Sequence, residues 1–195
     1  PVEGTTIADA EVQRISRMTK LCDILWETED GDQVIITTTR PELICACGIV
    51  LVHPDDMRYS HLIGKEIKLP LPVNGRSQKV IIQAHHSVKM EFGSGAVMVC
   101  SYGDQNDVAL FRELQLEEVI AIGLDGRMTE SAGDYQGLKP KQARTKIIED
   151  LENSGLVEKI EEISHRTPLS ERSKTPIEIV PMEEYYLKQK DSIDK

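Results

Sequence analysis

The sequence predicts a domain of mixed α/β class in which strands outnumber helices. Its 195 residues, 39% of them hydrophobic, suffice for one well-filled core, so we expect a single domain. Most apolar residues fall in short, often β-branched runs that glycine, proline and aspartate interrupt, which is typical of strands. Two longer segments repeat their apolar residues three or four positions apart, which favours amphipathic helices.

Residues 20–39 are expected to form a strand, a tight turn and a second strand. Asp30-Gly31 is a dipeptide typical of hairpin turns because both residue types tolerate positive φ. Apolar residues flank it on both sides: Leu21, Ile24, Trp26, Val34, Ile35 and Ile36. The first two strands should therefore pair as a hairpin.

A short helix is predicted directly after this hairpin. Thr39 would be its N-cap, Pro41 would lie in its first turn, and Glu42 three residues after the cap would complete a capping box. Gly48 would end this helix.

The next elements are mostly strands. Buried or proline-bounded strands are expected at 48–54, 65–72, 79–85 and 95–101. Residues 117–123, "EEVIAIG", also read as a strand, and 125–128, "DGRM", as a turn. We find no internal repeat.

Two amphipathic helices complete the expected fold. Residues 104–116 place Val108, Phe111 and Leu114 three apart, with Asp104 and Asp107 in the positions of an N-cap and its third helical residue. Residues 141–155 form the second helix, closed by Gly155. Its apolar stripe consists of Ala143, Ile147 and Leu151.

Charge and cysteine content exclude several classes of protein. A formal charge of −10 disfavours a protein that coats nucleic acid by charge alone. No run approaches the ~18 apolar residues of a membrane span. The chain begins at Pro1 without a methionine, so we expect a soluble piece of a longer, cytoplasmic protein. The cysteines Cys22, Cys45, Cys47 and Cys100 have no disulfide-scaffold spacing and are expected to be buried thiols.

Two polar stretches and one acidic pair are candidate sites, and each has a purely structural alternative. The segment 37–40, "TTTR", is either a strand end with a helix cap, or a place where helix N–H groups and Arg40 hold an anion or carbonyl. The segment 91–97, "EFGSGAV", is either a plain turn, or a turn whose glycines let a ligand approach the backbone. Asp104 and Asp107 either cap their helix or present carboxylates to an ammonium or a water.

Metal and nucleophile signals are weak. His53, Asp55 and Asp56 resemble hard ligands but fit a solvated turn better, and His85 and His86 would point to opposite faces of a strand. No Ser-His-Asp or Cys-His arrangement stands out. If the chain is a hydrolase, we expect water to attack.

Four stretches, taken in order, carry a family resemblance that covers nearly the whole chain. They are "TTTRPELICACGIVLVHPDD", "EFGSGAVMVCSYGDQNDV", "DGRMTESAGDYQGL" and "KTPIEIVPMEEYYLKQ". Together they resemble the editing insertion of valyl-tRNA synthetase, especially of the archaeal type. The resemblance implies a compact β-barrel-like α/β domain with a few flanking helices, inserted in a class I aminoacyl-tRNA synthetase. It implies hydrolysis of threonine wrongly esterified to valine tRNA, with no cofactor.

The resemblance also assigns site residues. Asp107 would bind the substrate α-ammonium, Asp104 would assist, and Arg40 would help position the terminal adenosine and its ester; these are the implied catalytic residues. The implied substrate-binding residues are Thr38, Thr39, Phe92, Gly93, Ser94 and Gly95. The implied partners are the 3′ end of mischarged tRNA(Val) and the parent catalytic domain, reached through connections at about 1–18 and 170–195.

Departures from the family pattern limit what can be transferred. Many bacterial members have lysine, histidine and threonine where Met98, Gly103 and Leu43 stand here. Zinc-binding cysteines of other members are absent from 1–10 and 171–179, so we expect no metal. A carboxylate or the vicinal ribose hydroxyl could activate the water.

The substrate and the activity also leave alternatives. The sister insertions of isoleucyl- and leucyl-tRNA synthetase would share the chemistry, and an inactive tRNA-binding insertion is a second class of function. Two basic groups could hold tRNA phosphates or be ordinary solvated charge: Lys139, Lys141, Arg144 and Lys146, and Arg166, Arg172 and Lys174.

Overall fold

The structure is a computed structural model that describes residues 7–71 and 78–182. Its strands are β1 (Val12–Thr28), β2 (Gln33–Thr38), β3 (Cys47–Val52), β4 (Glu66–Lys68), β5 (Lys79–Ala84), β6 (Ala96–Cys100) and β7 (Val157–Ser170). Its α-helices are α1 (Gln105–Glu113) and α2 (Pro140–Asn153), and its short 3₁₀ helices are η1 (Asp9–Glu11), η2 (Pro41–Ala46), η3 (Ser60–Leu62) and η4 (Glu130–Tyr135). In these described ranges no helix is long and apolar enough to cross a membrane.

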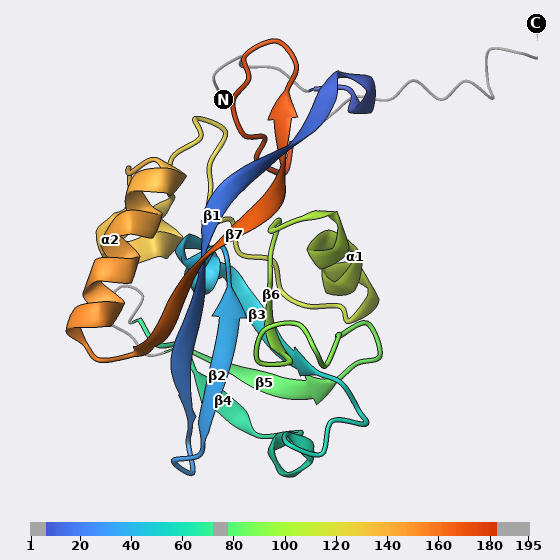
Figure 1. Cartoon of the computed structure of the whole chain (residues 1–195), viewed down its shortest axis with the longest axis vertical. Helices are drawn as coiled ribbons and strands as arrows, with labels where there is room; N and C mark the ends of the chain where they lie inside the picture. The colour runs from blue at the N-terminus through green and yellow to red at the C-terminus, as the bar shows by residue number, and fades with distance from the viewer. Residues whose placement is uncertain (1–6, 72–77, 183–195) are drawn as a thin grey trace, which may run out of the picture.

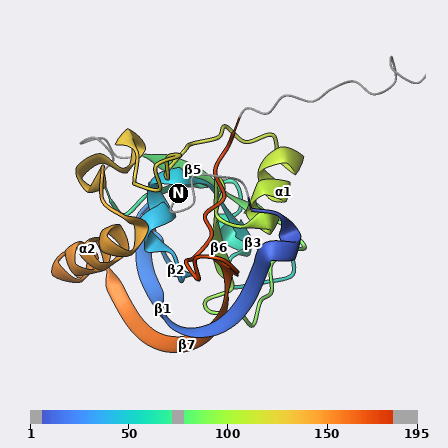
Figure 2. The same ribbon diagram turned by 90° about the horizontal axis from the view of Figure 1, so that it is seen from above.

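The strands form one curled sheet with the order β2-β1-β4-β5-β3-β6, and β7 pairs with β1 outside this path. The β3–β5 pair is parallel, and the other pairs are antiparallel. The sheet curls until its end strands β2 and β6 approach each other, which gives the barrel-like shape in Figures 1 and 2. The expected mixed α/β, barrel-like class is therefore confirmed.

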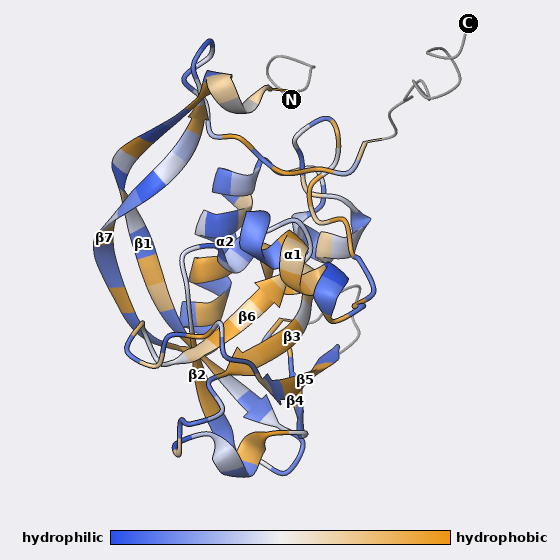
Figure 3. Cartoon of the chain, turned by 90° about the vertical axis from the view of Figure 1, so that its right-hand side faces the viewer, coloured by the Kyte–Doolittle hydropathy of each residue, from blue (hydrophilic) through white to orange (hydrophobic). Residues whose placement is uncertain are grey.

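The strands β1 and β7 form a long two-stranded ribbon that rises above the barrel (Figure 1). Their register runs from the Val12–Ser170 pair to the Ile24–Val157 pair, with an irregularity between Asp23 and Ile24. Much of the distal ribbon is solvent-exposed, and Figure 3 shows many hydrophilic residues along it. Neither β7 nor the first part of β1 is predicted from the sequence, because an exposed ribbon carries little hydrophobic alternation.

The core fills the barrel and extends under the helices. Trp26, Ile24 and Ile36 of the predicted hairpin are fully buried or nearly so. Each such side chain contributes roughly 1.5–3 kcal/mol when it leaves water. The predicted stripe on α2, Ala143, Ile147 and Leu151, packs against the same cluster. A second cluster lies under α1, where Phe111 contacts β3 and β6 residues.

The boundaries of the predicted helix after β2 differ from those in the structure. The short helix expected after β2 is present as the 3₁₀ helix η2, with Pro41 in its first turn. Its N-cap position is occupied by Arg40 and not by Thr39, and Arg40 makes no side-chain cap bond. Gly48 does not end a helix but lies inside β3, where an added Cβ would sit 2.6 Å from the Phe111 ring. The close approach of that ring explains why a glycine stands in a strand.

Residues 117–123 are not a strand. Only Ile122 makes a bridge, with Met128, around the predicted turn at 125–128. The backbone N–H of Val119 instead donates to the Ser101 hydroxyl at 2.8 Å. The Ser101 side chain thus satisfies the Val119 backbone N–H, which needs no hydrogen bond to a neighbouring strand. The four cysteines are all buried and free, as expected.

Candidate functional site

Strand β6 organises the candidate site, because residues 37–40 contact both the loop before this strand and the loop after it. At the start of β6, the Thr37 hydroxyl accepts a hydrogen bond from the Ser94 backbone N–H at 2.9 Å. Beyond its end, Arg40 Nη1 donates to the Gly103 carbonyl at 3.1 Å. The fold therefore brings together the threonine stretch, the glycine turn at 93–95 and the loop that leads to Asp104 and Asp107.

Thr37 supports the glycine turn. Its hydroxyl donates to Asp23 Oδ1 at 2.6 Å while it accepts from Ser94, so both roles of the hydroxyl are used. Gly93 has φ +57°, and a Cβ there would lie 2.5 Å from Thr37 Cβ. Only glycine allows this contact. Asp23 is not predicted from the sequence, because a single acid in a strand gives no signal.

The same turn is held from its other side by the segment that follows β3. The Tyr59 hydroxyl donates to the Ser94 carbonyl at 2.7 Å, and Arg58 Nη2 donates to the Met90 carbonyl at 3.0 Å. Phe92 at the tip of the turn is 53% exposed. An aromatic face is thus presented to solvent by a turn that is fixed on both sides.

Thr38 and Thr39 differ in what they offer a ligand. The Thr38 hydroxyl is buried and accepts the Arg40 backbone N–H at 3.0 Å. Thr39 is half-buried, and its side chain makes no hydrogen bond to any residue that the structure describes. Thr39 is therefore the one of the two whose hydroxyl is not used in a hydrogen bond to the described residues.

Arg40 is committed largely to contacts within the protein. Nε donates to Glu42 Oε1 at 3.0 Å and Nη2 to Glu178 Oε2 at 2.6 Å, besides the bond to Gly103. Burial alone would lower the pKa of Arg40, but the carboxylates of Glu42 and Glu178 raise it above its ordinary value. These bonds use three of the five guanidinium N–H groups, and the other two make no hydrogen bond to the described residues.

Glu42 is fully buried, and its role differs from the predicted capping box. Arg144 on α2 binds it with two hydrogen bonds, Nε to Oε2 at 2.8 Å and Nη2 to Oε1 at 2.6 Å. Burial would raise the pKa of Glu42, but the bonds and charges of Arg144 and Arg40 lower it, so the carboxylate is ionised. Arg144, one of the predicted phosphate-binding residues, is held by this interior contact.

The acidic pair stands at the start of α1. Asp104 is the N-cap as predicted, and its side chain accepts the Asp107 backbone N–H at 2.8 Å. Asp107 accepts only a long bond, 3.4 Å, from the Cys100 backbone N–H. Burial, followed by the charge of Asp104, raises the pKa of Asp107 to about 7, although Cys100 and Arg40 act in the opposite direction.

Asp107 is therefore a poorly satisfied carboxylate whose charge a cation would stabilise. No salt bridge to it forms among residues 7–71 and 78–182. Its position is fixed by Gly103, where an added Cβ would lie 2.1 Å from Asp107 Oδ2. A carboxylate with such a perturbed pKa, beside a second acid at the start of a helix, is a candidate for binding or catalysis.

The residues considered for a metal have other contacts. Asp56 binds Arg58 through both carboxylate oxygens, at 2.8 and 2.5 Å. The rings of His53 and His86 meet edge to face, with centroids 5.5 Å apart. His85 Nδ1 lies 2.7 Å from the Ser87 hydroxyl oxygen.

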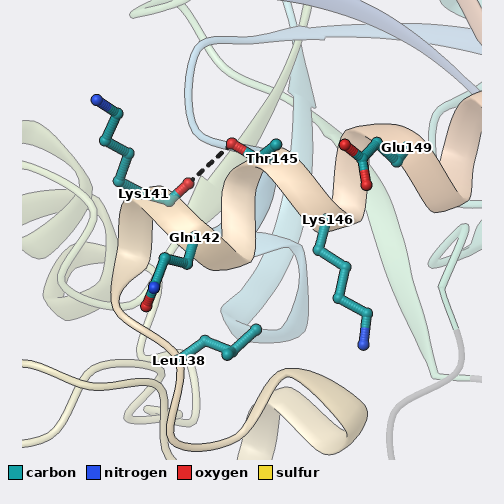
Figure 4. Close-up of a pocket in the computed structure, with 6 residues that line it drawn as sticks. All are labelled: Leu138, Lys141, Gln142, Thr145, Lys146 and Glu149. Atoms are coloured by element: carbon teal, nitrogen blue, oxygen red, sulfur yellow. Dashed lines mark hydrogen bonds between the residues drawn. The ribbon is translucent and has the colours of Figure 1, made fainter.

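One hollow on the described surface has none of the candidate site residues in its lining. It is a shallow groove along α2, lined by Leu138, Lys141, Gln142, Thr145, Lys146 and Glu149 (Figure 4). The Thr145 hydroxyl donates to the Lys141 carbonyl at 3.1 Å, a bond within the helix. The groove is open and lacks converging polar groups, so we place the candidate site at β6 instead.

Comparison with known proteins identifies relatives of the chain. No protein-family model matches it. The chain is 47% identical over 186 residues to the valine–tRNA ligase of Nanoarchaeum equitans. This alignment covers 95% of the chain and 24% of that protein. It is 46% identical over 192 residues to the valine–tRNA ligase of Methanocaldococcus jannaschii and 45% identical over 195 residues to that of Pyrococcus horikoshii. Both alignments cover 98% of this chain and 21% of the relative. The chain is therefore homologous, over nearly its whole length, to one segment of the archaeal valine–tRNA ligases.

Proposed function

We propose that this chain is the editing domain of a valine–tRNA ligase and hydrolyses the ester of threonine wrongly attached to valine tRNA. The similarity to valine–tRNA ligases supports the parent enzyme and favours valine over isoleucine or leucine. Because the chain spans less than a quarter of these relatives, the reaction itself is inferred from the site.

The observation that carries the proposal is the convergence of three polar segments along β6. Thr37 and Arg40 bond to opposite ends of that strand, at Ser94 and Gly103. The five residues of β6 rise about 3.4 Å each, so the two ends lie about 14–17 Å apart. One end presents the exposed Phe92 ring and the other presents Asp107. This arrangement suits an extended ligand with an aromatic base at one end and an ammonium at the other.

In this proposal Asp107 binds the α-ammonium of the misattached amino acid. The ammonium would supply the positive charge that the half-buried carboxylate lacks, and its binding would lower the pKa of Asp107. Asp104 orients Asp107 through the helix cap and adds negative charge. Thr39 and the two unused N–H groups of Arg40 bind the ester-bearing nucleotide. Water then attacks an ester carbonyl that these contacts hold in place.

Such a site would reverse the preference of the synthetic pocket. A hydrophobic pocket rejects threonine by only about a hundredfold, a figure established for enzymes of this family. An editing pocket instead offers partners to the threonine hydroxyl. Valine would leave these partners unsatisfied, at a cost of about 1–3 kcal/mol each. Discrimination therefore comes from hydrogen bonding.

The geometry of the ribbon fits an insertion in a larger protein. Val12 and Ser170 are register partners, so the proposed connections at 1–18 and 170–195 begin side by side. An inserted domain requires such closely spaced ends. We propose that the ribbon leads towards the parent catalytic domain.

The test is a deacylation assay of the chain on threonyl-tRNA(Val), with valyl-tRNA(Val) and a reaction without protein as controls. We expect release of threonine well above both controls. Asp107→Asn should remove most of this activity, whereas the exposed Asp134→Asn should not. Binding of tRNA without hydrolysis would support an inactive tRNA-binding insertion instead.

Blocking the substrate amine separates the role of the Asp107 charge from its role in the helix. N-acetyl-threonyl-tRNA(Val) should be a poor substrate for the wild-type chain. The same block should add little to the defect of Asp107→Asn, because both changes remove one interaction. Fully additive losses would show that Asp107 and the ammonium do not meet.

A further inference from the structure

The charged group behind the site includes a residue from the segment that follows β7. Four side chains form a charge-balanced cluster of two acids and two arginines: Arg40, Glu42, Arg144 and Glu178. Glu178 is only 14% exposed and lies 138 residues from Arg40 in the sequence. Its 2.6 Å bond to Arg40 Nη2 joins the C-terminal segment to the site.

The segment that carries Glu178 is anchored to the fold by its backbone. The Ser170 N–H donates to the Thr175 carbonyl at 3.0 Å, and the Ile177 N–H donates to the Pro168 carbonyl at 3.1 Å. The chain then crosses the end of the barrel, as the view from above in Figure 2 shows. Residues 171–182, here called the C-terminal strap, therefore hold Glu178 in a defined position.

Arg40 transmits the position of Glu178 to the loop after β6. Its three nitrogens each make a different contact: Nε with Glu42, Nη2 with Glu178 and Nη1 with the Gly103 carbonyl. A planar guanidinium fixes the relative directions of these bonds. A loss of the Glu178 bond would let the group turn about its contact with Glu42 and release Gly103.

Gly103 in turn determines where the Asp107 carboxylate can lie. The Gly103 Cα faces Asp107 so closely that a Cβ would fall 2.1 Å from Oδ2. A small shift of Gly103 therefore moves the carboxylate or leaves a gap beside it. Misplacement by about 1 Å can cost a reaction roughly a hundredfold.

We propose that Glu178 is a positioning residue of the editing site: through Arg40 and the Gly103 carbonyl, it holds the loop that carries Asp104 and Asp107. Glu178 itself touches neither substrate nor water. This inference rests on the proposed function for its effect on hydrolysis, but the positional link can be measured without substrate. It also makes the C-terminal strap a route by which the rest of a longer protein can act on the site.

The test compares Glu178→Gln with Glu171→Gln in the whole 195-residue chain. Glutamine keeps an acceptor for Arg40 but removes the charge, and Glu171 is an exposed acid on the same strap. The first readout is the set of backbone amide NMR shifts without tRNA. Glu178→Gln should shift the signals of Gly103, Asp104 and Asp107, and Glu171→Gln should leave them in place. Shifts confined to Arg40 and the neighbours of Glu178 would overturn the proposal.

The second readout is deacylation of threonyl-tRNA(Val). Glu178→Gln should lower kcat about tenfold with little change in KM, since substrate contacts remain but are poorly aligned. Glu178→Asp, which keeps the charge, should recover part of the loss. The losses from Arg40→Lys and Glu178→Gln should be less than additive in the double variant. Unchanged kcat in Glu178→Gln would overturn the proposal. A wild-type chain with no hydrolysis would overturn the proposed function, and the NMR shifts would still decide the positional link.

Discussion

Arg144 on α2 binds the fully buried carboxylate of Glu42 through two hydrogen bonds of 2.8 and 2.6 Å, across 102 residues of sequence. The pair joins η2, which follows the threonine stretch, to the helix that closes the core. Arg40 shares the same carboxylate. A buried charge of this kind is tolerated only while its partners remain.

Arg144→Met should therefore destabilise the chain strongly. Removing one partner of a buried ion pair typically costs about 3–5 kcal/mol, and Arg40 keeps the loss at the lower end of this range. For a chain of this length, about 3 kcal/mol corresponds to a fall in Tm of roughly 6–12 °C. Thermal unfolding followed by circular dichroism measures it.

Lys141→Met on the exposed face of the same helix is the matched control and should change the free energy of unfolding by no more than ~0.5 kcal/mol. Equal effects of the two substitutions would show that the Glu42–Arg144 contact does not contribute to stability.

Gly103→Ala should damage the site more than the fold. The new methyl group would meet Asp107 Oδ2 at 2.1 Å, so the carboxylate has to rotate away from its position. We expect deacylation of threonyl-tRNA(Val) to fall by at least about tenfold, since a displaced binding group loses alignment. Stopped deacylation assays across substrate concentrations give kcat and KM.

Gly123→Ala is the control for the glycine substitution itself. A Cβ at Gly123 would meet the flexible end of Asp125 at 3.1 Å and no residue of the candidate site within 4 Å among its three nearest atoms. Its deacylation rate should match the wild type. A fully active Gly103→Ala chain would contradict the position assigned to Asp107.

The sequence predicted those elements whose buried face repeats regularly. Ala143, Ile147 and Leu151 on α2 and the hairpin of β1 and β2 are where periodicity placed them. The strand β7 was missed because only its last residues are buried, so its alternation is weak. Its pairing with β1 depends on backbone hydrogen bonds, and such bonds cannot be recognised from the residue types.

The residues of the candidate site lie in stretches that the sequence singled out, but the long-range contacts between them could not be predicted. The stretches that carry the family resemblance contain Thr37, Arg40, Ser94, Gly103 and Asp107. The local pattern Thr-Arg-Pro-Glu favoured a capping box, yet Glu42 is drawn into the core by Arg144, which lies 102 residues away. Long-range pairing of this kind overrides a local propensity and has no local signal.

Binding of tRNA should depend on the lysines at the start of α2 and not on Arg144. Lys139, Lys141 and Lys146 are exposed, whereas Arg144 is held by Glu42. If the lysines contact phosphates, their joint reversal to glutamate should weaken tRNA binding. It should also reduce the slope of log K against log salt by about 2–3. Fluorescence anisotropy at several salt concentrations measures both effects, and an unchanged slope would exclude this face from the interface.

The stability of the chain should depend on pH through Asp107. Its pKa lies near 3.8 in the unfolded chain and is raised to about 7 in the fold, mainly by burial. Between these values the unfolded state has released the proton while the folded state still holds it. Stability linked to this group therefore falls as pH rises from about 4 to 7 and stays low above that. The shift corresponds to a cost on the order of 2–4 kcal/mol at pH 8.

Asp107→Asn should remove this cost, although it also loses a favourable charge at the start of α1 that is worth about 0.3–1 kcal/mol. The variant should be more stable than the wild type at pH 8, and its advantage should shrink at pH 5. Urea unfolding of both chains at the two pH values measures the difference, with Asp134→Asn as the control for an exposed acid. A gain in stability combined with a loss of deacylation is the pattern expected of a residue retained for binding at the expense of the fold. An advantage that stays constant between pH 5 and pH 8 would mean that Asp107 titrates alike in both states, and the carboxylate would then be no more ready to bind an ammonium than a surface aspartate.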